Sequence, residues 1–349
     1  MSSFHEIIGQ RRPIQILQSF LVNKAVPNVL LFAGDEGIGK RTTAITFVRT
    51  LLCLNVSQEE GEANPCNTCL SCQKIDHGNH PDFTILTPPE AKSAGGSIPS
   101  IPIEEIRALQ KRIVFEPTDG KQRVILIVPA EKMTAEAQNA MLKTLEEPPT
   151  YVVFILVCSK PSQMLPTIVS RCQKVSFSPL SLSQIESILM DRKAVSTADA
   201  RLLASLTGGK LGEALSLEVE TARALEEDLN SLVKEETVSH YDTLFETAVR
   251  FSADAETLET ALSYLSAYFR DLLVLHAVPD GALLDPSYLV FSWRRDELLA
   301  WSRRMNADEV GRFLADMAAI QQALARNINR QLVLETLLMK MRDKLVMTP

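Results

Sequence analysis

The chain has 349 residues, of which 46% are hydrophobic and 23% are charged, so it is long enough to form two or three domains with ordinary buried cores. Its net charge of −7 and its pI near 5.4 argue against nucleic-acid binding through overall positive charge, although a local basic patch is compatible with both values. The chain does not open on a basic-then-apolar signal region, and its longest apolar runs fall far short of the roughly 18 residues of a membrane span, so we expect a cytoplasmic protein with no membrane contact.

Strand-like apolar runs alternate with helical patterns from residue 1 to about residue 178. The expected strands are residues 28–33, 83–87, 123–128, 151–158 and 174–177. Helical spacing is present at Ile14/Leu17/Leu21, at Ile103/Ile106/Leu109/Ile113 and at Ala137/Ala140/Met141/Leu145. The alternation predicts an α/β domain with a parallel sheet covered by helices on both faces. Residues 91–101, rich in Ser, Gly and Pro, predict a flexible surface loop.

Only helical patterns follow residue 178. The stretch TGGKLGEAL, residues 207–215, predicts a turn and then the start of a helix. Residues 215–260 contain 12 acidic and 3 basic side chains, and we interpret this excess chiefly as a solvated helix face.

A phosphate-binding loop is predicted at residues 34–40, with the sequence GDEGIGK. It follows an apolar run and precedes a helical stretch, which is the context that a P-loop requires. Gly34, Gly37 and Gly39 would let backbone N–H groups surround the phosphates of ATP or ADP, and Lys40 would reach the β and γ oxygens. The alternative is a glycine-rich turn that binds no nucleotide.

The residues that usually hold Mg²⁺ beside such a loop are missing. Arg41 stands where a hydroxyl residue is expected, and Thr42 lies one position too late, about 100° further round the helix. On the strand at 123–128, Val128 and Pro129 replace the expected acidic pair, and Glu131 is the first carboxylate. We therefore expect no ATP hydrolysis by this site, whereas nucleotide binding stays open.

A metal site is predicted from four cysteines, Cys53, Cys66, Cys69 and Cys72, in the pattern C-x12-C-x2-C-x2-C. Four thiolates suit a closed, tetrahedral, structural Zn²⁺ site, and the polar, loop-like stretch SQEEGEANP would let the chain return to Cys53. His77 and His80 follow closely and could replace one cysteine. Chance clustering or a redox motif is the alternative. Cys158 lies in an apolar strand run and is assigned to the core.

The segment LPTIVSRC places Arg171 after a short helix that follows the strand at 151–158. An arginine is suited to stabilising phosphoryl charge because its planar guanidinium stays charged. On the surface beyond the sheet, Arg171 could serve the ATP of a neighbouring protein. An isolated surface arginine is more often simply solvated.

The ordered set GxxGxGK, four cysteines, HPDF, IEEIR, AQNAMLKTLEEPP, LPTIVSRC and GGKLGEAL closely resembles bacterial clamp-loader subunits over nearly the whole chain. Residues 4–10, FHEIIGQ, are similar to the family segment beside the nucleotide base, and residues 325–341 are similar to its final collar helices. In detail the chain resembles the delta-prime branch of that family.

The resemblance implies an AAA+ fold: a RecA-like domain at 1–178 with a zinc module at about 53–72, a helical lid at 179–220, and a helical collar at 221–349 that joins subunits into a five-membered ring. Such rings use ATP to open the sliding beta clamp and leave it on primed DNA, and they contain gamma/tau and delta subunits. The resemblance also implies that Arg171 acts as an arginine finger on the ATP of a neighbouring gamma/tau subunit, and that Ser159 occupies the sensor-1 position. The sensor-2 arginine of the lid is replaced by Gly212.

Three hypotheses follow. The first is a ring subunit that does not hydrolyse ATP by itself and supplies Arg171 to a partner. The second is a self-sufficient gamma/tau-type motor, which requires Glu131 to reach Mg²⁺; Arg41, Val128-Pro129 and Gly212 argue against it. The third is a zinc-stabilised nucleic-acid-binding module outside replication, which the acidic pI disfavours.

Overall fold

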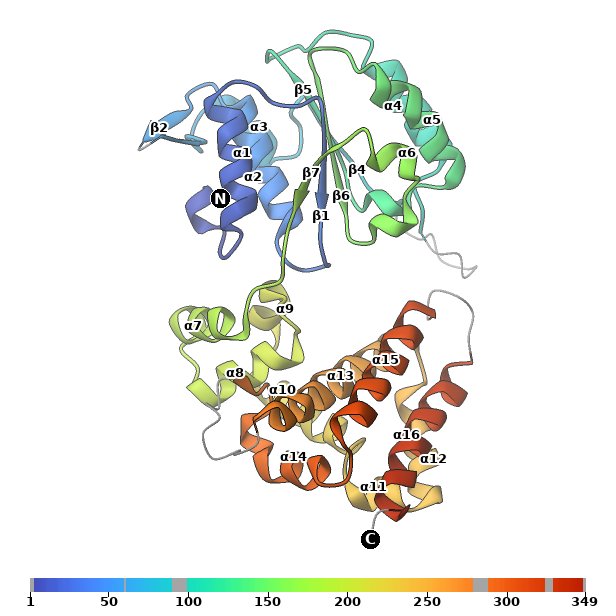
Figure 1. Cartoon of the computed structure of the whole chain (residues 1–349). Helices are drawn as coiled ribbons and strands as arrows, with labels where there is room; N and C mark the ends of the chain where they lie inside the picture. The colour runs from blue at the N-terminus through green and yellow to red at the C-terminus, as the bar shows by residue number, and fades with distance from the viewer. Residues whose placement is uncertain (1–2, 60, 90–98, 279–287, 324–328, 348–349) are drawn as a thin grey trace. The chain divides into compact units, whose positions relative to one another are not determined.

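The computed structural model describes residues 3–59, 61–89, 99–278, 288–323 and 329–347 (Figure 1). The chain divides into two compact units, Met1–Leu180 and Ser181–Pro349. The predicted first boundary, after residue 178, lies close to this division. The split of the second half into a lid and a collar stays a prediction. Among the described helices, none is long and apolar enough to cross a membrane.

The first unit is built on a parallel sheet, as predicted, with the strand order β4-β5-β6-β1-β7. Its strands are β1 (Val29–Ala33), β4 (Phe83–Leu86), β5 (Arg123–Ile127), β6 (Val152–Cys158) and β7 (Gln173–Ser176). At the carboxyl edge Ala33 pairs with both Cys158 and Ser176. The ends of β6, β1 and β7 therefore meet where ligands bind in open α/β sheets.

Helices cover both faces of this sheet, with α1 to α3 on one side and α4 to α6 on the other (Figure 1). The α-helices are α1 (Arg11–Val22), α2 (Lys40–Leu52), α3 (Leu70–Asp76), α4 (Ile103–Arg112), α5 (Ala135–Glu146) and α6 (Pro166–Val169). Single 3-10 turns are η1 (Phe4–Glu6), η2 (Ala130–Lys132) and η3 (Pro161–Gln163).

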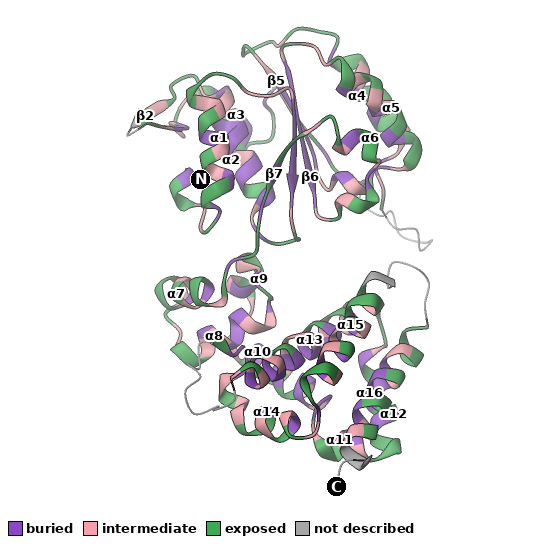
Figure 2. Ribbon diagram, viewed as in Figure 1, coloured by how far each residue is buried: buried purple, intermediate pink, exposed green. Residues whose placement is uncertain are grey.

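The strand residues are divided between the two faces by the period-2 alternation of a pleated sheet. Leu30 and Phe32 pack with α1 and α2, whereas Leu31 and Ala33 pack with the α4–α5 side. Every residue of β1, β5 and β6 is buried (Figure 2). Strands that are covered on both faces have such continuous apolar sequences, and this is why the sequence predicts them as interior strands.

Two local predictions need correction. The stretch expected to be a loop before the cysteine cluster contains an antiparallel pair, β2 (Ser57–Glu59) and β3 (Glu62–Asn64). The buried Gln18 of α1 explains this pairing in a polar segment, because its amide donates to Ala63 O at 3.0 Å and accepts from Ala63 N at 2.8 Å. The flexible loop expected at 91–101 lies mostly outside the described residues, but its last residue, Ile101, is fully buried and bridged to Met133.

The second unit is helical throughout its described residues, as predicted. Its helices are α7 (Leu182–Lys193), α8 (Thr197–Leu206), α9 (Leu211–Ser216), α10 (Val219–Asn230), α11 (Glu235–Ser239), α12 (Tyr241–Phe251), α13 (Ala255–Ala277), η5 (Ser292–Arg294), α14 (Arg295–Ser302), α15 (Ala307–Ala323) and α16 (Arg330–Met347). The turn and helix start predicted at 207–215 are confirmed by the end of α8 and the start of α9. Its core centres on α13, where Phe269 packs against Trp301 and Phe313.

Candidate functional site

The predicted phosphate loop lies between β1 and α2, as the sequence indicates. Gly34, Gly37 and Gly39 have φ values of 150°, 77° and 93°, which favour glycine. At Gly34 a Cβ would also lie 2.5 Å from Phe177 O. Gly39 is the N-cap of α2, so the free N–H groups of the first helical turn point at the loop. The backbone therefore has the form of an anion-binding loop.

Lys40 is buried and its ammonium group is held by the loop itself. Nζ donates to Gly34 O at 2.6 Å, to Asp35 O, and to Ser159 Oγ at 3.2 Å. Burial lowers the pKa of Lys40, and the nearby Glu131 carboxylate partly offsets this. The structure thus brings together the P-loop lysine and the predicted sensor residue, and a bound phosphate would compete with these carbonyls for the ammonium group.

The first turn of α2 offers no well-placed hydroxyl for a metal ion. Arg41 and Thr42 are both exposed. The following Thr43 is buried, and its hydroxyl donates to Gly39 O at 2.9 Å. No residue described in this turn therefore replaces the metal-binding hydroxyl that is missing at position 41.

Glu131 lies beside this cluster, a contact that the spacing of the sequence did not predict. The turn η2 carries its side chain to the end of β6, where Oε1 accepts from Ser159 N at 2.9 Å. Oε2 is buried and has no hydrogen-bond partner among the described residues. One signal in the sequence could have found it: Glu131 and Ser159 both follow neighbouring strands of a parallel sheet, whose carboxyl ends share one edge.

The four predicted cysteines meet in one cluster, in which one ligand atom from each lies within 4.8 Å of the others. The Sγ of Cys53 is 3.5 Å from that of Cys66 and 3.9 Å from that of Cys69. Backbone N–H donation, first from Thr68, lowers the pKa of Cys66 to about 6, which favours the thiolate. Four convergent sulfur donors fit a tetrahedral metal ion.

The two histidines near this cluster have other contacts. His80 is buried against the Ser71 hydroxyl, with Nε2 and Oγ 3.0 Å apart, and exposed His77 lies with Nδ1 2.7 Å from Gln73 O. In the described part of the chain the metal-competent group consists of the four cysteines alone. Cys158 is fully buried in β6, as expected for a core residue.

The cysteine cluster is attached to the far end of the P-loop helix. Cys53 directly follows α2, and Ser71 Oγ donates to Leu52 O, one of the last carbonyls of that helix, at 2.7 Å. Arg49 of α2 donates to Asn67 Oδ1 at 3.0 Å and forms an ion pair with Asp76. The helix that begins in the phosphate loop therefore ends in the candidate metal module.

Arg171 lies just beyond α6, and among the described residues its side chain makes no hydrogen bond or ion pair with Lys40 or the residues around Lys40. Nη1 donates to Thr167 O at 2.8 Å, and Nη2 donates to Glu146 Oε1 at 2.5 Å. The side chain of Arg171 keeps 35% of its surface exposed. The buried amide of Gln138 fixes the entry to α6, because its Oε1 accepts from Leu165 N at 2.7 Å. The exposed side chain of Arg171 is thus held by contacts with α5 and α6.

Gly212 belongs to α9 of the second unit, and a Cβ added there would meet nothing within 4 Å. Glycine at this position is therefore not required by packing.

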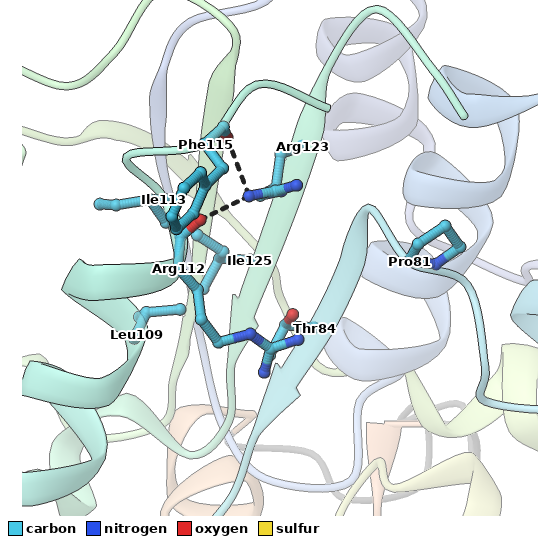
Figure 3. A pocket seen from close by; sticks show the side chains of 8 residues that line it. All are labelled: Pro81, Thr84, Leu109, Arg112, Ile113, Phe115, Arg123 and Ile125. Carbon is cyan, nitrogen blue, oxygen red and sulfur yellow. Dashed lines mark hydrogen bonds between the residues drawn. The ribbon is translucent and has the colours of Figure 1, made fainter. Parts of the chain in front are cut away.

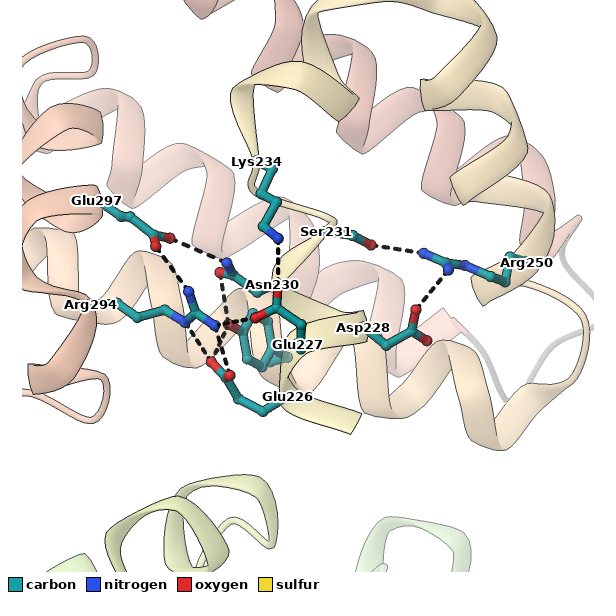
Figure 4. A network of polar contacts seen from close by, with 10 residues as sticks. Glu226, Glu227, Asp228, Asn230, Ser231, Lys234, Arg250, Arg294 and Glu297 are labelled. Carbon is teal, nitrogen blue, oxygen red and sulfur yellow. Dashed lines mark hydrogen bonds and ion pairs between the residues drawn. The ribbon is translucent and has the colours of Figure 1, made fainter. Parts of the chain in front are cut away.

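Most of the described acidic side chains in the stretch 215–260 are exposed, in agreement with a solvated helix face, and Glu226 is an exception. Glu226 is buried and pairs with Arg294, with Oε1 2.6 Å from Nε (Figure 4). Arg294 also contacts Glu227 and Glu297, and Asp228 pairs with Arg250. Glu226 and Glu227 therefore help to hold α10 to η5.

A separate cavity of about 200 Å³ lies beside β4, β5 and the end of α4 (Figure 3). Arg123 borders it and donates to Arg112 O at 2.6 Å and to Phe115 O at 2.9 Å. On its other side the guanidinium reaches the fully buried Asp82, at 3.4 Å. These contacts tie the chain that follows α4 to the sheet.

Comparison with known proteins finds similarity to the first unit. A family model described as "DNA polymerase III, delta subunit" matches residues 9–181. DNA polymerase III subunit delta' of Bacillus subtilis is 34% identical over 60% of this chain and 59% of its own length. The subunit delta' of Pseudomonas aeruginosa is 39% identical over 41% of this chain and 40% of its own length.

A DNA polymerase III subunit tau of Bacillus subtilis is also similar, with 30% identity over 61% of this chain and 37% of its own length. The matched region thus spans less than two thirds of each of these relatives. The range matched by the family model contains the phosphate loop, the four cysteines and Arg171.

Proposed function

Because residues 9–181 match the family model described as "DNA polymerase III, delta subunit", we propose that this chain acts as a delta-prime-like subunit of the polymerase III clamp loader. In this role it would join gamma/tau and delta subunits and support ATP-dependent loading of the sliding beta clamp onto primed DNA in the cytoplasm. The observation that carries the proposal is a phosphate loop that keeps Lys40 but lacks both expected Mg²⁺ ligands, together with an exposed arginine elsewhere on the same unit.

The first part of the proposal is that the chain binds nucleotide without hydrolysing it. Mg²⁺ prefers several oxygen ligands in near-octahedral geometry. Thr42 is exposed, the Thr43 hydroxyl is bonded to Gly39 O, and one Glu131 oxygen is occupied by Ser159 N. The loop, Lys40 and Ser159 would hold ATP or ADP through its phosphates, with no assembled group to activate water.

The second part is that Arg171 acts on the ATP of a neighbouring gamma/tau subunit. Arginine supplied in trans can stabilise the negative charge that develops on a transferred phosphoryl group. Arg171 makes its contacts with Thr167 and Glu146 and not with the chain's own phosphate loop. An exposed guanidinium carried by a packed segment is suited to reach an ATP site on a neighbouring subunit.

The third part is that Cys53, Cys66, Cys69 and Cys72 hold a structural Zn²⁺ ion. All four positions are thiols from the protein, so no position is left for water or substrate. The ion would cross-link the end of α2 to α3. Ser71 and Arg49 reinforce the same junction through hydrogen bonds. This assigns the metal to stability and not to chemistry.

The decisive experiment compares Arg171→Ala with the wild-type chain in a reconstituted clamp loader. We expect DNA-stimulated ATP hydrolysis and clamp loading to fall by about tenfold or more, since arginine fingers contribute large factors to hydrolysis. Lys174→Ala, an exposed cation on β7 in the same region, serves as the matched control. Unchanged hydrolysis in Arg171→Ala would show that the trans role is wrong.

One observation favours a second candidate, a gamma/tau-type ATPase motor. Glu131 approaches Ser159 and the charge of Lys40, so a carboxylate is present beside the loop despite its offset in the sequence. Hydrolysis by the purified chain alone, lost in Lys40→Ala, would establish this alternative and exclude the non-hydrolysing role.

A further inference from the structure

Glu146 and Arg171 come from different segments and meet on the surface of the first unit. Glu146 is the last residue of α5, and Arg171 follows the short helix α6. Their side chains are joined by a charge-assisted hydrogen bond of 2.5 Å between Nη2 and Oε1. Because Nη1 donates to Thr167 O at 2.8 Å, the guanidinium is held at two of its nitrogens.

The backbone that carries Glu146 is fixed by the packing of α5. The preceding Leu145 and the residue one turn earlier, Met141, are both buried against the sheet. The same helix carries Gln138, whose amide fixes Leu165 at the entry to α6. Both the carboxylate and the segment that bears Arg171 are therefore mounted on one packed helix.

This geometry limits the rotamers of an exposed side chain that would otherwise be mobile. A free arginine samples many rotamers, and this freedom must be lost when its guanidinium binds a phosphate. An arginine has five N–H donors, so the contacts to Glu146 and Thr167 leave donors for a further anion. An exposed ion pair is also weak, so it can orient the guanidinium without preventing its contact with a phosphate.

We propose that Glu146 is a positioning residue that orients Arg171 for the ATP of the neighbouring subunit. The inference rests on the proposed trans role of Arg171. It assigns a function to the carboxylate that precedes the two prolines at the end of α5, where the sequence alone shows only a polar helix end. In this role Glu146 acts only through Arg171 and does not itself contact nucleotide.

The test uses the reconstituted loader with Glu146→Ala, Arg171→Ala and the double variant. We expect Glu146→Ala to lower the kcat of DNA-stimulated ATP hydrolysis by about two- to fivefold, the factor that corresponds to an exposed ion pair, with an unchanged KM for ATP. In the Arg171→Ala background the same substitution should have no further effect. Glu147→Ala is the matched control, because that neighbouring carboxylate is exposed and its side chain makes no hydrogen bond or ion pair among the described residues.

The outcomes separate this inference from the proposed function. If Arg171→Ala lowers hydrolysis but Glu146→Ala leaves kcat unchanged or raises it, the positioning role is wrong and the trans arginine stands. An equal loss from Glu146→Ala in both backgrounds would also overturn the positioning role. If Arg171→Ala itself has no effect, the proposed function fails. Should Glu146→Ala fold poorly, Glu146→Gln decides, because it keeps the shape and an acceptor oxygen and should give an intermediate kcat.

Discussion

The side-chain amide of Gln10 donates to Ser178 O at 2.7 Å, so the segment before α1 is bonded to the chain as it leaves the first unit. The same Nε2 donates to Ile38 O, in the phosphate loop, at 3.1 Å. Gly9 packs so closely that a Cβ there would lie 1.7 Å from a side-chain carbon of Leu180. The start of the chain, the phosphate loop and the last residues of the unit thus share one buried junction.

Replacing Gln10 with alanine should destabilise this junction. The Gln10 side chain is buried, and its loss would leave the carbonyls of Ile38 and Ser178 without this donor. We expect the free energy of unfolding of the first unit to fall by about 1–3 kcal/mol, measured by urea denaturation. Gln15→Ala, an exposed glutamine of α1 whose side chain makes no hydrogen bond among the described residues, should change it by less than about 0.5 kcal/mol. Equal effects of the two substitutions on the free energy of unfolding would contradict this stabilising role of Gln10.

Nucleotide binding should depend on Lys40 and on pH. Lys40→Ala should weaken ATP binding by about tenfold or more in calorimetric titration, because a charged hydrogen-bond donor to phosphate is lost. Burial lowers the pKa of Lys40, so its ammonium should deprotonate at a lower pH than that of an exposed lysine. Affinity for ATP should therefore decline earlier as the pH rises into the alkaline range. Lys121→Ala, at an exposed position, is the control, and ATP binding that is insensitive to Lys40→Ala would refute the nucleotide site.

Metal removal should destabilise the first unit. Elemental analysis should find one zinc ion per chain, and a chelator or Cys66→Ser should lower Tm by about 5 °C or more, because metal binding is coupled to folding. Cys172→Ser makes the same atomic change at a cysteine outside the cluster, where the thiol donates to Ile168 O at 3.1 Å. No bound zinc together with an unchanged Tm in Cys66→Ser would disprove the metal assignment.

Asp82 should contribute stability that is lost in acid. Burial alone would raise the pKa of its carboxyl group, but N–H donors from Thr118, Asp119 and Gly120, together with Arg123, lower it below the ordinary value. A depressed pKa in the folded state means that the stabilisation is present above the unfolded-state pKa, near 4, and disappears as the pH falls through the folded-state value.

Asp82→Asn should therefore lower the free energy of unfolding at pH 7 by about 3 kcal/mol and flatten its decline below pH 4. Denaturant unfolding at pH 7 and at pH 3 measures both effects. Glu105→Gln, an exposed carboxylate of α4, is the control and should reproduce neither. An acid decline as steep in Asp82→Asn as in the wild-type chain would rule out this carboxylate as its source.

The elements of the first unit could be predicted from short-range sequence patterns. Continuous apolar runs such as residues 152–158 allow little besides an interior strand, and the glycines of the phosphate loop have the positive φ values that their spacing indicates. The cysteine spacing likewise predicted a cluster that the fold does assemble. In each case the chemistry lies within a few dozen neighbouring residues.

The contacts that were missed join residues far apart in the chain. The polar hairpin β2–β3 forms because Gln18 of α1 satisfies the backbone of Ala63. In the second unit the buried Glu226 pairs with Arg294, far along the sequence. No local pattern contains both members of such pairs. Their partners are set by the packing of separate elements.

The sequence by itself determined the sheet, the phosphate loop, the four sulfur donors and the presence of an arginine at position 171. Only the tertiary structure decided that Glu131 lies at Ser159 and that Glu146 holds Arg171. The reason is physical: periodicity and motif spacing report the residue's own element, whereas the partner of a charged side chain depends on which strand ends and helix ends the packed sheet brings together.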